Sequence, residues 1–576
     1  MPIPNAEIAR QFRELADLLE VEGANPFRVR AYRNAARTIE ASPQSIADLA
    51  RRGGVPALDA LPGIGADLAG KIVEIATTGA LEALARERRA LPKGITTLLE
   101  VPGIGPKRAR QLALALGVTS LAGLERAARE GRVRALPGFG AVTEAKLLRA
   151  LRQKAGEGRR FLRSVAAQYG EALLEHLRAV PGVERAEIAG SYRRCRDTVG
   201  DLDLLVTCAP RTPVVERFVT WPEVAEVLAR GPTRAAVRLR AGLQVDLRVL
   251  RPESYGAGLY YFTGSKAHNI AVRSLAQARG LKLNEYGVFK DGRRVAGATE
   301  EEVARAVGLP LIPPELREDR GEIAAAQAGA LPVLVELRDL RGDLQMHTTD
   351  SDGADSLEAM AEAAEALGHE YIAVTDHSPL VRVARGLDAA GFRRQRRRID
   401  RLNARLRTLT VLAGAEVDIR PDGTLDLDDG TLAALDVVVA TMHVKLDLPP
   451  DAQTRRVVRA LRHPAVDILG HPTGRELGRR PGARFDFEQV LAAAADLGVM
   501  LEINAQPERL DLDDVMARAA VARGVPLVIS TDAHAAGQLG LLRWGVDQAR
   551  RAWATRSAVA NTEPLSRFRR RLHGTR

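Results

Sequence analysis

The chain has few of the features that mark secreted or membrane proteins. Only two of its 576 residues are cysteines, Cys195 and Cys208, which argues against a disulfide framework although one bridge remains possible. No run of about 18 apolar residues is present, so no membrane-spanning helix is expected. The first residues, MPIPNAEIAR, lack the basic and then apolar order of a signal peptide. We therefore expect a cytoplasmic protein without a membrane partner.

Lysine is also scarce, because only nine of the 84 basic residues are lysines and the rest are arginines. Basic residues nevertheless outnumber acidic ones, giving a formal charge of +11 and a pI near 9.9. This balance favours a polyanionic partner, although many basic proteins bind no nucleic acid. At about 100 to 200 residues per domain, the chain should contain three or more domains.

From residue 342 onward, short apolar runs end one after another at side chains that can bind metals. Parallel strands buried on both faces read as such runs, and functional groups of parallel barrels gather at the carboxyl ends of the strands. Six runs end at a candidate ligand, and a seventh, VMLEIN, ends at Asn504. A lone histidine is more often structural, but five of the chain's ten histidines occupy equivalent positions here. The candidate ligands are His347, Asp352, His377, Glu416, His443, His471, Asp532 and His534.

Imidazole and carboxylate groups together suit zinc or manganese, and eight of them are too many for one tetrahedral ion. The sequence therefore predicts a barrel that holds two or three metal ions.

The first 155 residues repeat one phrase three times, as LPGIGADLAGKI, VPGIGPKRARQL and LPGFGAVTEAKLL. Each copy reads as a turn that enters a helix, where unpaired amide groups can bind a phosphate without reading bases. The phrase resembles the helix-hairpin-helix motif. One copy could be a simple tight connection, but three copies favour binding to a nucleic-acid backbone. The predicted DNA contacts are Gly63, Gly65, Gly103, Gly105, Lys107, Gly138 and Gly140.

The segment EIAGSYRRCRDTVGDLDLLV indicates a centre for phosphoryl chemistry. Asp201 and Asp203 are two positions apart in an apolar strand, so both point to one face, and Asp246 lies in another apolar strand. Three carboxylates can hold two divalent ions, which would activate an attacking hydroxyl and neutralise the leaving phosphate. A solvent-facing acidic strand is the simpler alternative. The turn at Gly190 and Ser191, with Arg193 and Arg194 after it, could hold a triphosphate and argues against that alternative.

A nucleotide pocket is indicated downstream, in LYYFTGSKAHNIAVRSLAQARGLKLNEYGVF. Tyr261 and Phe262 could form a wall against a sugar, and Gly264 keeps them near an irregular turn. Asn269 and Arg273 are four residues apart and would share a helix face.

The motifs GSYRR, GDLDLL, VDLRV, YFTGS and NEY, in this order, resemble a family X DNA polymerase of the DNA polymerase beta kind. The last 240 or so residues resemble a PHP (polymerase and histidinol phosphatase) domain. The whole chain thus resembles the bacterial family X polymerases with a C-terminal PHP domain. The resemblance implies helical helix-hairpin-helix domains, an α+β nucleotidyltransferase palm and thumb, and a distorted (β/α)7 barrel.

The resemblance also implies residue roles. Asp201, Asp203 and Asp246 would bind two Mg²⁺ or Mn²⁺ ions, with Asp246 as the base for the primer hydroxyl. The implied nucleotide contacts are Gly190, Ser191, Arg194 and Gly200 at the phosphates, Tyr261, Phe262 and Gly264 at the sugar, Asn269 at the base and Arg273 at the template.

Three positions depart from the family pattern. Lys71 aligns with the family's lyase lysine and Tyr32 with a tyrosine of that pocket, but Phe27 and Asp67 stand where relatives with lyase activity carry basic residues. On its own, Lys71 is either an ordinary phosphate contact or an amine that forms a Schiff base.

Gln345 replaces the first histidine of the PHP domain's usual His-x-His, so one metal would bind weakly or take a water.

We expect a lyase-like helical domain at residues 1–85, a second hairpin-bearing subdomain at 86–155, a palm at 156–252, a thumb at 253–318, a linker at 319–337 and the PHP domain at 338–576. The predicted protein is a monomeric gap-filling repair polymerase that uses gapped or primed DNA and dNTPs. Its barrel, with Mn²⁺ or Zn²⁺, would act as a 3′–5′ exonuclease and at abasic sites. The alternatives are a barrel that hydrolyses small phosphates and a non-catalytic scaffold that binds DNA ends.

Overall fold

The computed structural model describes residues 3, 5–42, 45–61, 63–91, 94–99, 101, 104–141, 143–145, 147–148, 151 and 160–572. The chain forms two compact units. The first contains residues 1–161, with the short segments 167–172 and 478–480, and the second contains the remainder. In the described part of the chain, no helix is both long and apolar enough to cross a membrane.

The first unit is helical. Its helices begin at cap residues that satisfy free amide groups, such as Asn25 before α2 and Ser120 before α8, or with proline in the first turn, as in α7. One hydrophobic core runs from Ile8 to Leu151. The helices with described bounds are α1 (Asn5–Glu22), α2 (Pro26–Ala41), α3 (Ile46–Asp59), α4 (Ala66–Thr78), α5 (Glu82–Ala90), α6 (Ile95–Leu99), α7 (Pro106–Leu116) and α8 (Leu121–Arg129), and the described residues 141, 143–145, 147–148 and 151 are also helical.

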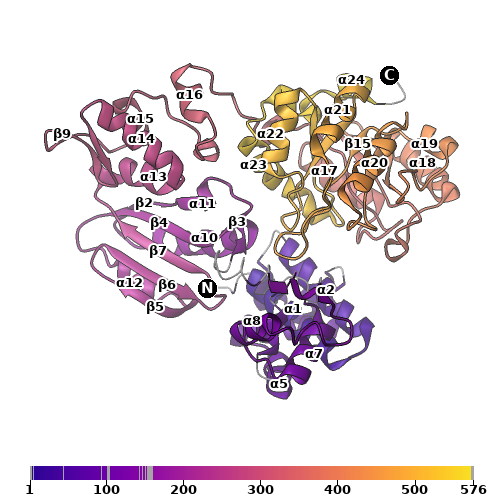
Figure 1. The fold of residues 1–576 in the computed structure, drawn as a ribbon, viewed down its shortest axis with the longest axis horizontal. Helices are drawn as coiled ribbons and strands as arrows, with labels where there is room; N and C mark the ends of the chain where they lie inside the picture. Colours follow the sequence, from indigo (N-terminus) through magenta and orange to yellow (C-terminus); the bar gives the residue numbers. More distant parts are fainter. Residues whose placement is uncertain are drawn as a thin grey trace. The chain divides into compact units, whose positions relative to one another are not determined.

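The second unit begins with a mixed sheet in the order β2-β4-β7-β6-β5, in which β4 and β7 are parallel and the other pairs antiparallel. Figure 1 shows these strands side by side, with α12 near β5 and β6. The elements are β1 (Phe161–Leu162), α10 (Arg163–Arg178), β2 (Val183–Ile188), α11 (Gly190–Arg193), β3 (Thr198–Val199), β4 (Asp201–Cys208), α12 (Val214–Val219), β5 (Val224–Arg230), β6 (Arg234–Leu239) and β7 (Gln244–Val249).

A smaller helical region with a three-stranded sheet follows, built around its own core of buried residues such as Tyr260 and Val272. Its elements are η1 (Pro252–Ser254), α13 (Tyr255–Thr263), α14 (Lys266–Ala278), β8 (Lys282–Asn284), β9 (Gly287–Lys290), β10 (Arg293–Ala296), α15 (Glu300–Ala306) and η2 (Pro314–Leu316).

The segment predicted to be a linker contains two short helices, α16 (Glu322–Gln327) and η3 (Leu337–Asp339). Glu322 is fully buried at the start of α16, and its Oε1 lies 2.6 Å from Nδ1 of His268 on α14. The Ala-rich composition therefore forms a helix whose first turn packs on the preceding region.

Seven parallel strands in sequential order, β11 to β17, form the last part of the chain. Their residues are almost all buried, as the apolar runs predict. The strands are β11 (Gly342–Asp343), β12 (Tyr371–Val374), β13 (Thr410–Asp418), β14 (Val437–Thr441), β15 (Ile468–Leu469), β16 (Met500–Asn504) and β17 (Leu527–Ser530).

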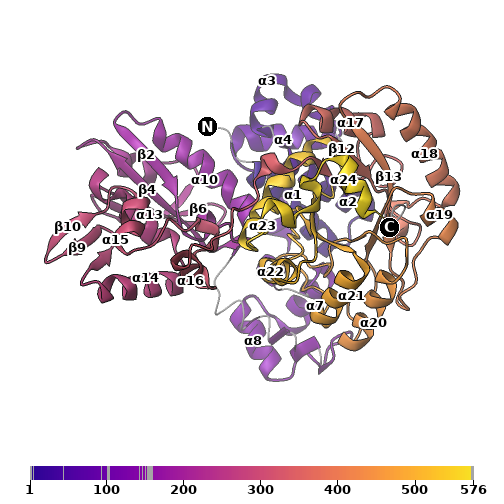
Figure 2. The same ribbon diagram turned by 90° about the horizontal axis from the view of Figure 1, so that it is seen from above.

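Helices lie between these strands, and Figure 2 shows them placed around the sheet. They are α17 (Leu357–Ala366), η4 (Arg382–Ala384), α18 (Ala389–Asn403), α19 (Asp429–Ala433), α20 (Pro450–Leu461), α21 (Phe487–Leu497), α22 (Asp514–Arg523), η5 (Ala536–Leu541), α23 (Leu542–Arg551), η6 (Arg556–Ala558), η7 (Ala560–Thr562), α24 (Leu565–Phe568) and η8 (Arg569–Arg571).

The first and last strands come together at a junction that nearly closes the sheet into a barrel. A parallel bridge joins Met346, after β11, to Ala533, after β17. Below it, the fully buried side chain of Asn561 donates to the backbone carbonyls of Gly342 and Ile529, at 2.8 Å each, and accepts from the amide of Ile529 at 3.1 Å. We call this junction of β11 and β17 the seam of the barrel.

Candidate functional site

The predicted barrel ligands all follow strands of the barrel and converge at one end. His347 and Asp352 come after β11, His377 after β12, and Glu416 lies within β13. His443, His471, and the pair Asp532 and His534 follow β14, β15 and β17, respectively. This end is the carboxyl end of the strands, where parallel barrels place their sites.

Glu416 lies at the centre of the cluster and is almost completely buried. Its Oε1 is 2.8 Å from Nε2 of His471 and 3.3 Å from Nε2 of His443. Its Oε2 is 3.2 Å from Nε2 of His347 and 3.5 Å from Nδ1 of His377. A carboxylate with each oxygen facing two imidazoles is placed to bridge two metal ions.

Three sets of ligand atoms lie within 4.8 Å of one another, namely His347, Asp352, His377 and His534; His377, Glu416 and His443; and His347, Glu416 and Asp532. The sets share His347, His377 and Glu416, so they form one continuous cluster. Its nitrogen and carboxylate donors fit two or three zinc or manganese ions. The fully buried Nδ1 atoms of His347, His377 and His471 have no hydrogen-bond partner among the described residues, which leaves them free for ligation.

Burial and neighbouring charges shift the pKa of several groups in this cluster. Burial would raise the pKa of Glu416, but the imidazoles of His377 and His443 hold it well below its usual value. Burial would likewise raise the pKa of Asp352, and the hydrogen bond from His534 with neighbouring imidazoles lowers it to about 2. Burial lowers the pKa of His377 to about 4. Both carboxylates and a neutral His377 are therefore in the forms that bind metals.

Residues that sequence reasoning did not identify support these ligands. Asp418 is fully buried, and its Oδ1 lies 3.2 Å from Nδ1 of His443, as expected for a carboxylate that orients a metal-binding imidazole. Its position two residues after Glu416 on the same strand was an available signal. Arg509, whose side chain lies 4.0 Å from Asp532, adds a cation that could face a phosphate. No local pattern marks Arg509.

Two further residues near the ends of the apolar runs have roles that differ from those of the ligands. Asn504 donates from Nδ2 to Asp532 at 3.1 Å, so it orients a ligand. Gln345 is fully buried, and both polar atoms of its side chain lack a partner in the described residues. An unpartnered amide in this position can face the cluster, but it is a poorer ligand than imidazole.

In the mixed sheet, the parallel pairing of β4 and β7 places Asp203 directly beside Asp246. Asp201 is two positions earlier on β4, on the same face. Burial, with the charges of Asp201 and Asp246, raises the pKa of Asp203 to about 7. Gln244 donates from Nε2 to Asp246 at 2.8 Å. Among the described residues, clusters of ligand atoms within 4.8 Å are all in the barrel, so these three carboxylates are spread more widely.

The turn before β4 is a single helical turn, α11, and Gly190 begins it. A Cβ at Gly190 would lie 2.5 Å from Oδ2 of Asp203, and the residue has a φ of 65°. Only glycine fits such a close approach in this conformation. The backbone at Gly190 therefore lies directly against the carboxylate of Asp203, and Gly200 directly precedes β4.

The charges of Arg248 and Arg194 oppose the rise in the pKa of Asp203. The Nε of Arg194 donates to Glu318 at 3.0 Å and its Nη1 to the carbonyl of Thr263 at 2.8 Å. Arg551 on α23 donates to the same Glu318 oxygen at 3.0 Å, to the carbonyl of Arg194 at 2.6 Å and to Asp514 at 2.6 Å. A residue of the barrel region thus holds the loop that carries Arg194.

The other predicted nucleotide contacts gather beside α13 and α14. Asn269 donates to the carbonyls of Tyr261, at 2.7 Å, and Gly264, at 3.2 Å. A Cβ at Gly264 would lie 2.5 Å from the Asn269 side chain. Tyr261 and Phe262 meet edge to face with ring centres 5.2 Å apart.

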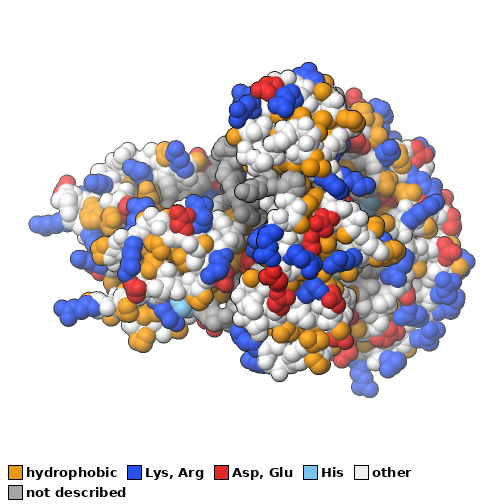
Figure 3. Space-filling model, turned by 90° about the horizontal axis from the view of Figure 1, so that it is seen from below, with side chains coloured by type: hydrophobic (Ala, Val, Ile, Leu, Met, Phe, Trp, Pro, Cys, Tyr) orange, Lys and Arg blue, Asp and Glu red, His pale blue; other side chains and the backbone are white. Residues whose placement is uncertain are grey.

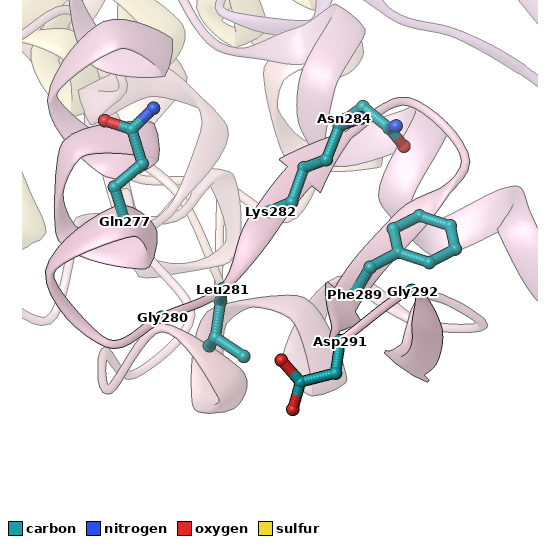
Figure 4. A pocket seen from close by; sticks show the side chains of 8 residues that line it. All are labelled: Gln277, Gly280, Leu281, Lys282, Asn284, Phe289, Asp291 and Gly292. Carbon is teal, nitrogen blue, oxygen red and sulfur yellow. The ribbon is translucent and has the colours of Figure 1, made fainter.

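Arg273 and Tyr261 line a hollow of about 340 Å³ together with Gln277, Lys282, Asn284 and Glu285. A second hollow adjoins it, and Figure 4 shows Gln277, Lys282 and Asn284 around it with Phe289 and Asp291. Asn284 and Glu285 belong to the NEY motif, so the structure joins this motif to Arg273.

The three predicted hairpins each lead into helical residues as expected, and the described residues 141, 143–145, 147–148 and 151 after Gly140 are helical. Gly65 and Gly105 are the N-caps of α4 and α7, and neither helix has a side-chain cap, so their first amide groups stay available. A Cβ at Gly63, Gly105, Gly138 or Gly140 would meet no atom within 4 Å, and one at Gly65 only Asp59, at 4.0 Å. These turns are open to an approaching backbone. Lys107 is exposed in the first turn of α7, and Gly103 lies outside the described residues.

Lys71 on α4 is engaged with an acidic neighbour. Its Nζ lies 2.5 Å from Oδ1 of Asp67 and 5.9 Å from the ring centre of Tyr32. Tyr32 is buried, and Phe27 is 74 % exposed. The residue that departs from the family pattern, Asp67, thus pairs directly with the candidate lyase amine.

Charge does not locate a DNA path on the face shown in Figure 3, where Lys and Arg side chains are spread widely with acidic ones among them. The glycine hairpins, the three carboxylates of the mixed sheet and the barrel cluster are better guides than surface charge to where DNA would bind.

Family models match much of the chain. The helix-hairpin-helix domain matches residues 3–81, the SAM-like helix-hairpin-helix tandem residues 95–153, the DNA polymerase beta thumb residues 258–318 and the PHP domain residues 343–505. The "DNA polymerase/3'-5' exonuclease PolX" of Bacillus subtilis is 37% identical over 563 residues, which cover 97% of each chain. The chain belongs to this family of family X DNA polymerases with a PHP domain.

Some relatives of this family X polymerase match a smaller part of the chain. A "Probable phosphatase" of Thermoanaerobacter is 30% identical over 38% of the chain and 90% of its own length. A "Probable phosphatase" of Shewanella oneidensis is 31% identical over 34% of the chain and 78% of its own length. The predictions of the family, the fold class and an enzyme are confirmed. The roles of individual residues and the domain boundaries stay predictions.

Proposed function

We propose that the chain extends primers on gapped or primed DNA at the carboxylates of the mixed sheet and shortens DNA from the 3′ end at the barrel cluster. The observation that carries this proposal is the presence of two separate ligand sets in a chain that matches a polymerase/exonuclease over nearly its whole length. Each set combines donors suited to divalent cations. The chain would act as a monomer that fills short gaps in repair, with abasic sites as further substrates.

In the polymerase reaction, Asp201, Asp203 and Asp246 would hold two Mg²⁺ or Mn²⁺ ions, which when bound lower the barrier to in-line displacement by neutralising developing charge. Asp246 would accept the proton of the primer hydroxyl, and Gln244 holds its Oδ2 in place. Arg194, with Gly190, Ser191 and Gly200, would bind the triphosphate. The aromatic pair and Gly264 would bound the sugar, Asn269 would meet the base, and Arg273 would contact the template side.

In the barrel, His347, Asp352, His377, Glu416, His443, His471, Asp532 and His534 would hold two or three Mn²⁺ or Zn²⁺ ions, which when bound polarise a phosphodiester and supply a nucleophile at neutral pH. Glu416, whose two oxygens each face two imidazoles, would be a central ligand of this set. Arg509 would offset the charge of the bound phosphate, and Asn504 and Asp418 would keep their ligands oriented.

For the first unit, we propose that the three hairpins bind the DNA backbone through Gly63, Gly65, Gly103, Gly105, Lys107, Gly138 and Gly140. We assign lyase-like and hairpin-bearing parts to residues 1–85 and 86–155, the palm to 156–252, the thumb to 253–318, the linker to 319–337 and the PHP domain to 338–576. Lys71 is the candidate lyase residue.

The test is a primer-template assay with Mn²⁺ or Mg²⁺, with and without dNTPs, on the wild type, Asp201→Ala and His377→Ala. We expect extension to vanish only in Asp201→Ala and shortening only in His377→Ala. Extension that survives Asp201→Ala would contradict the polymerase site and favour a scaffold. Shortening that survives His377→Ala would contradict the barrel nuclease.

A barrel that hydrolyses small phosphates is the second candidate, favoured by the similarity of about a third of the chain to two proteins named as probable phosphatases. The two are separated by comparing His377-dependent turnover of primed DNA with that of small phosphomonoesters. A barrel that cleaves only the latter would replace the nuclease proposal.

A further inference from the structure

The segment from Arg382 to Arg407 is the most basic stretch around the barrel. It carries ten arginines and only two acidic residues, Asp388 and Asp400, which gives a formal charge of +8 over 26 residues. The segment begins just after the ligand His377 and includes η4 and α18. Its charge therefore lies next to the barrel cluster in the fold as well as in the sequence.

Two arginines of α18 are used for internal contacts. Arg396 pairs with Asp400 and Asp436, both at 3.1 Å, and Arg398 pairs with Asp350 at 2.7 Å. Six others are exposed, and within the described part of the chain none of their side chains has a hydrogen bond or an ion pair. These six, which we call the outer arginines, are Arg393, Arg394, Arg397, Arg401, Arg405 and Arg407.

The outer arginines of α18 lie on its solvent-facing side. Phe392, Gln395 and Ile399 are buried on the opposite side, while Arg393, Arg397 and Arg401 follow at intervals of four residues. Eight residues of helix span about 12 Å, which equals three or four nucleotides of one strand at roughly 3.4 Å each. A strand laid along α18 would therefore meet successive guanidinium groups.

Direct contacts tie α18 to the loops that carry metal ligands. Gln395 donates from Nε2 to Asp376, the residue before His377, at 2.5 Å and to Asp350 at 3.1 Å. Arg385, between η4 and α18, donates to the carbonyl of Ser351, the residue before Asp352, at 2.5 Å. The basic face thus has a fixed position relative to the cluster, because both ligand loops anchor it.

We propose that the outer arginines bind the sugar-phosphate backbone of a single DNA strand and hold its 3′ end at the barrel cluster. Unpaired arginines on a rigid helix suit phosphate groups, because their planar donors match the oxygens of each phosphate and are weakly hydrated. The inference rests on the proposed nuclease function of the barrel and extends it by naming the surface that binds the substrate strand.

The test variant reverses three charges, Arg393→Glu, Arg397→Glu and Arg401→Glu together, in the full chain. The matched control reverses three exposed arginines of another barrel helix, Arg455→Glu, Arg459→Glu and Arg462→Glu, which gives the same change in net charge. Figure 2 shows α20, which carries this control, apart from α18. Far-ultraviolet circular dichroism and melting curves verify that both variants fold.

The first readout is the binding of a single-stranded oligonucleotide in EDTA, measured by fluorescence anisotropy at several salt concentrations. The salt slope is the change in the logarithm of the binding constant with the logarithm of the salt concentration, and each lost phosphate contact reduces its size by about 0.7. We therefore expect the slope of the test variant to be smaller by roughly 2 and that of the control to equal the wild-type slope. This readout needs no nuclease activity.

The second readout compares two substrates with Mn²⁺. We expect kcat/KM for the oligonucleotide to fall at least tenfold in the test variant, while the p-nitrophenyl ester of thymidine 5′-monophosphate, which has a single phosphodiester, is cleaved as by the wild type. If the wild type cleaves neither substrate but the slope changes as stated, the nuclease proposal fails and the binding surface stands. If both readouts of the test variant equal those of the control, the inference is wrong.

Discussion

At the scale of single residues, the fold changes the pKa of Asp203 in the mixed sheet. Burial and the adjacent carboxylates raise its pKa from 3.8 to about 7. The folded-state pKa lies above the unfolded one, so the stability this group gives the metal-free protein is complete below about pH 4 and is lost as the pH rises through about 7. The charged form becomes favourable once a cation is bound.

Cation binding at this centre should therefore displace a proton below pH 7. We expect the Mg²⁺ concentration for half-maximal primer extension to rise about tenfold for each pH unit below 7 and to be constant above it. Titrations of Mg²⁺ between pH 6 and 8, at saturating dNTP and DNA, measure this. A requirement that does not change across this range would contradict the assignment of Asp203.

Lys71 gives a second prediction at this scale. Its ion pair with Asp67 occupies the amine, whereas Schiff-base formation requires the nitrogen lone pair to be free. We expect little borohydride-trapped adduct between the wild type and DNA with a 5′-deoxyribose phosphate, and severalfold more with Asp67→Ala. The double variant Asp67→Ala and Lys71→Ala is the control, in which the adduct should vanish. Equal trapping by the wild type and Asp67→Ala would refute this role of Asp67.

At the scale of secondary-structure elements, the seam depends on one side chain. Asn561 makes three buried hydrogen bonds to Gly342 and Ile529. Asn561→Ala would leave these backbone groups unpaired, and we expect the barrel to lose about 3 kcal/mol of stability, since each such group costs roughly 1 to 3 kcal/mol. Urea unfolding of the protein, followed by tryptophan fluorescence, measures the loss.

The matched control is Asn403→Ala. Asn403 makes two hydrogen bonds to Val411, joining α18 to β13 away from the seam, and is only partly buried. We expect a smaller loss of stability and full metal content, whereas Asn561→Ala should also bind less Mn²⁺ per chain. Equal effects of the two substitutions would mean that the seam has no special role.

The elements that sequence could predict are those with a repeated pattern. The apolar runs predict the barrel strands because every strand is buried on both faces, and the ligand positions follow from the ends of the runs. Spacing alone places Asp201 and Asp203 together. The Gly190 segment was expected as a turn, but it forms a helical turn because its amide and carbonyl groups pair locally, as in the bond from Arg194 to Gly190.

Partners that are distant in the sequence could not be predicted. Arg551 and Arg194 are separated by 357 positions, and neither lies in a pattern that points to the other. Glu318 and Arg509 are similar cases, since a single charged residue in a loop has no periodicity. Only the folded chain brings these groups together.

At the scale of the whole molecule, Arg551 connects the barrel region to the proposed nucleotide site through Glu318 and Arg194. Arg551→Met removes the bonds to Glu318, to the Arg194 carbonyl and to Asp514. We expect the KM for dNTP to rise about fivefold, equivalent to roughly 1 kcal/mol for a lost hydrogen bond, with kcat changed less than twofold. Steady-state extension kinetics at varied dNTP concentration measure KM and kcat separately.

Arg550→Met is the matched control for this prediction. Arg550 is the neighbouring arginine on α23, and it contacts Glu315 and the Val335 carbonyl but not the Arg194 loop. A KM that is the same in the two variants would show that the connection through Arg551 does not act on nucleotide binding. Exonuclease rates should match the wild type in both.

The seam has a consequence for biosynthesis. His347 comes from the start of the barrel, and Asp532 and His534 follow its last strand. The cluster is therefore completed only when Met346 and Ala533 form their bridge and Asn561 joins Gly342 to Ile529. The carboxylates of the polymerase centre all lie before residue 250, and they leave the ribosome far earlier. A chain translated only as far as residue 250 therefore already contains the three carboxylates of the mixed sheet, whereas the barrel cluster requires residues up to Asn561.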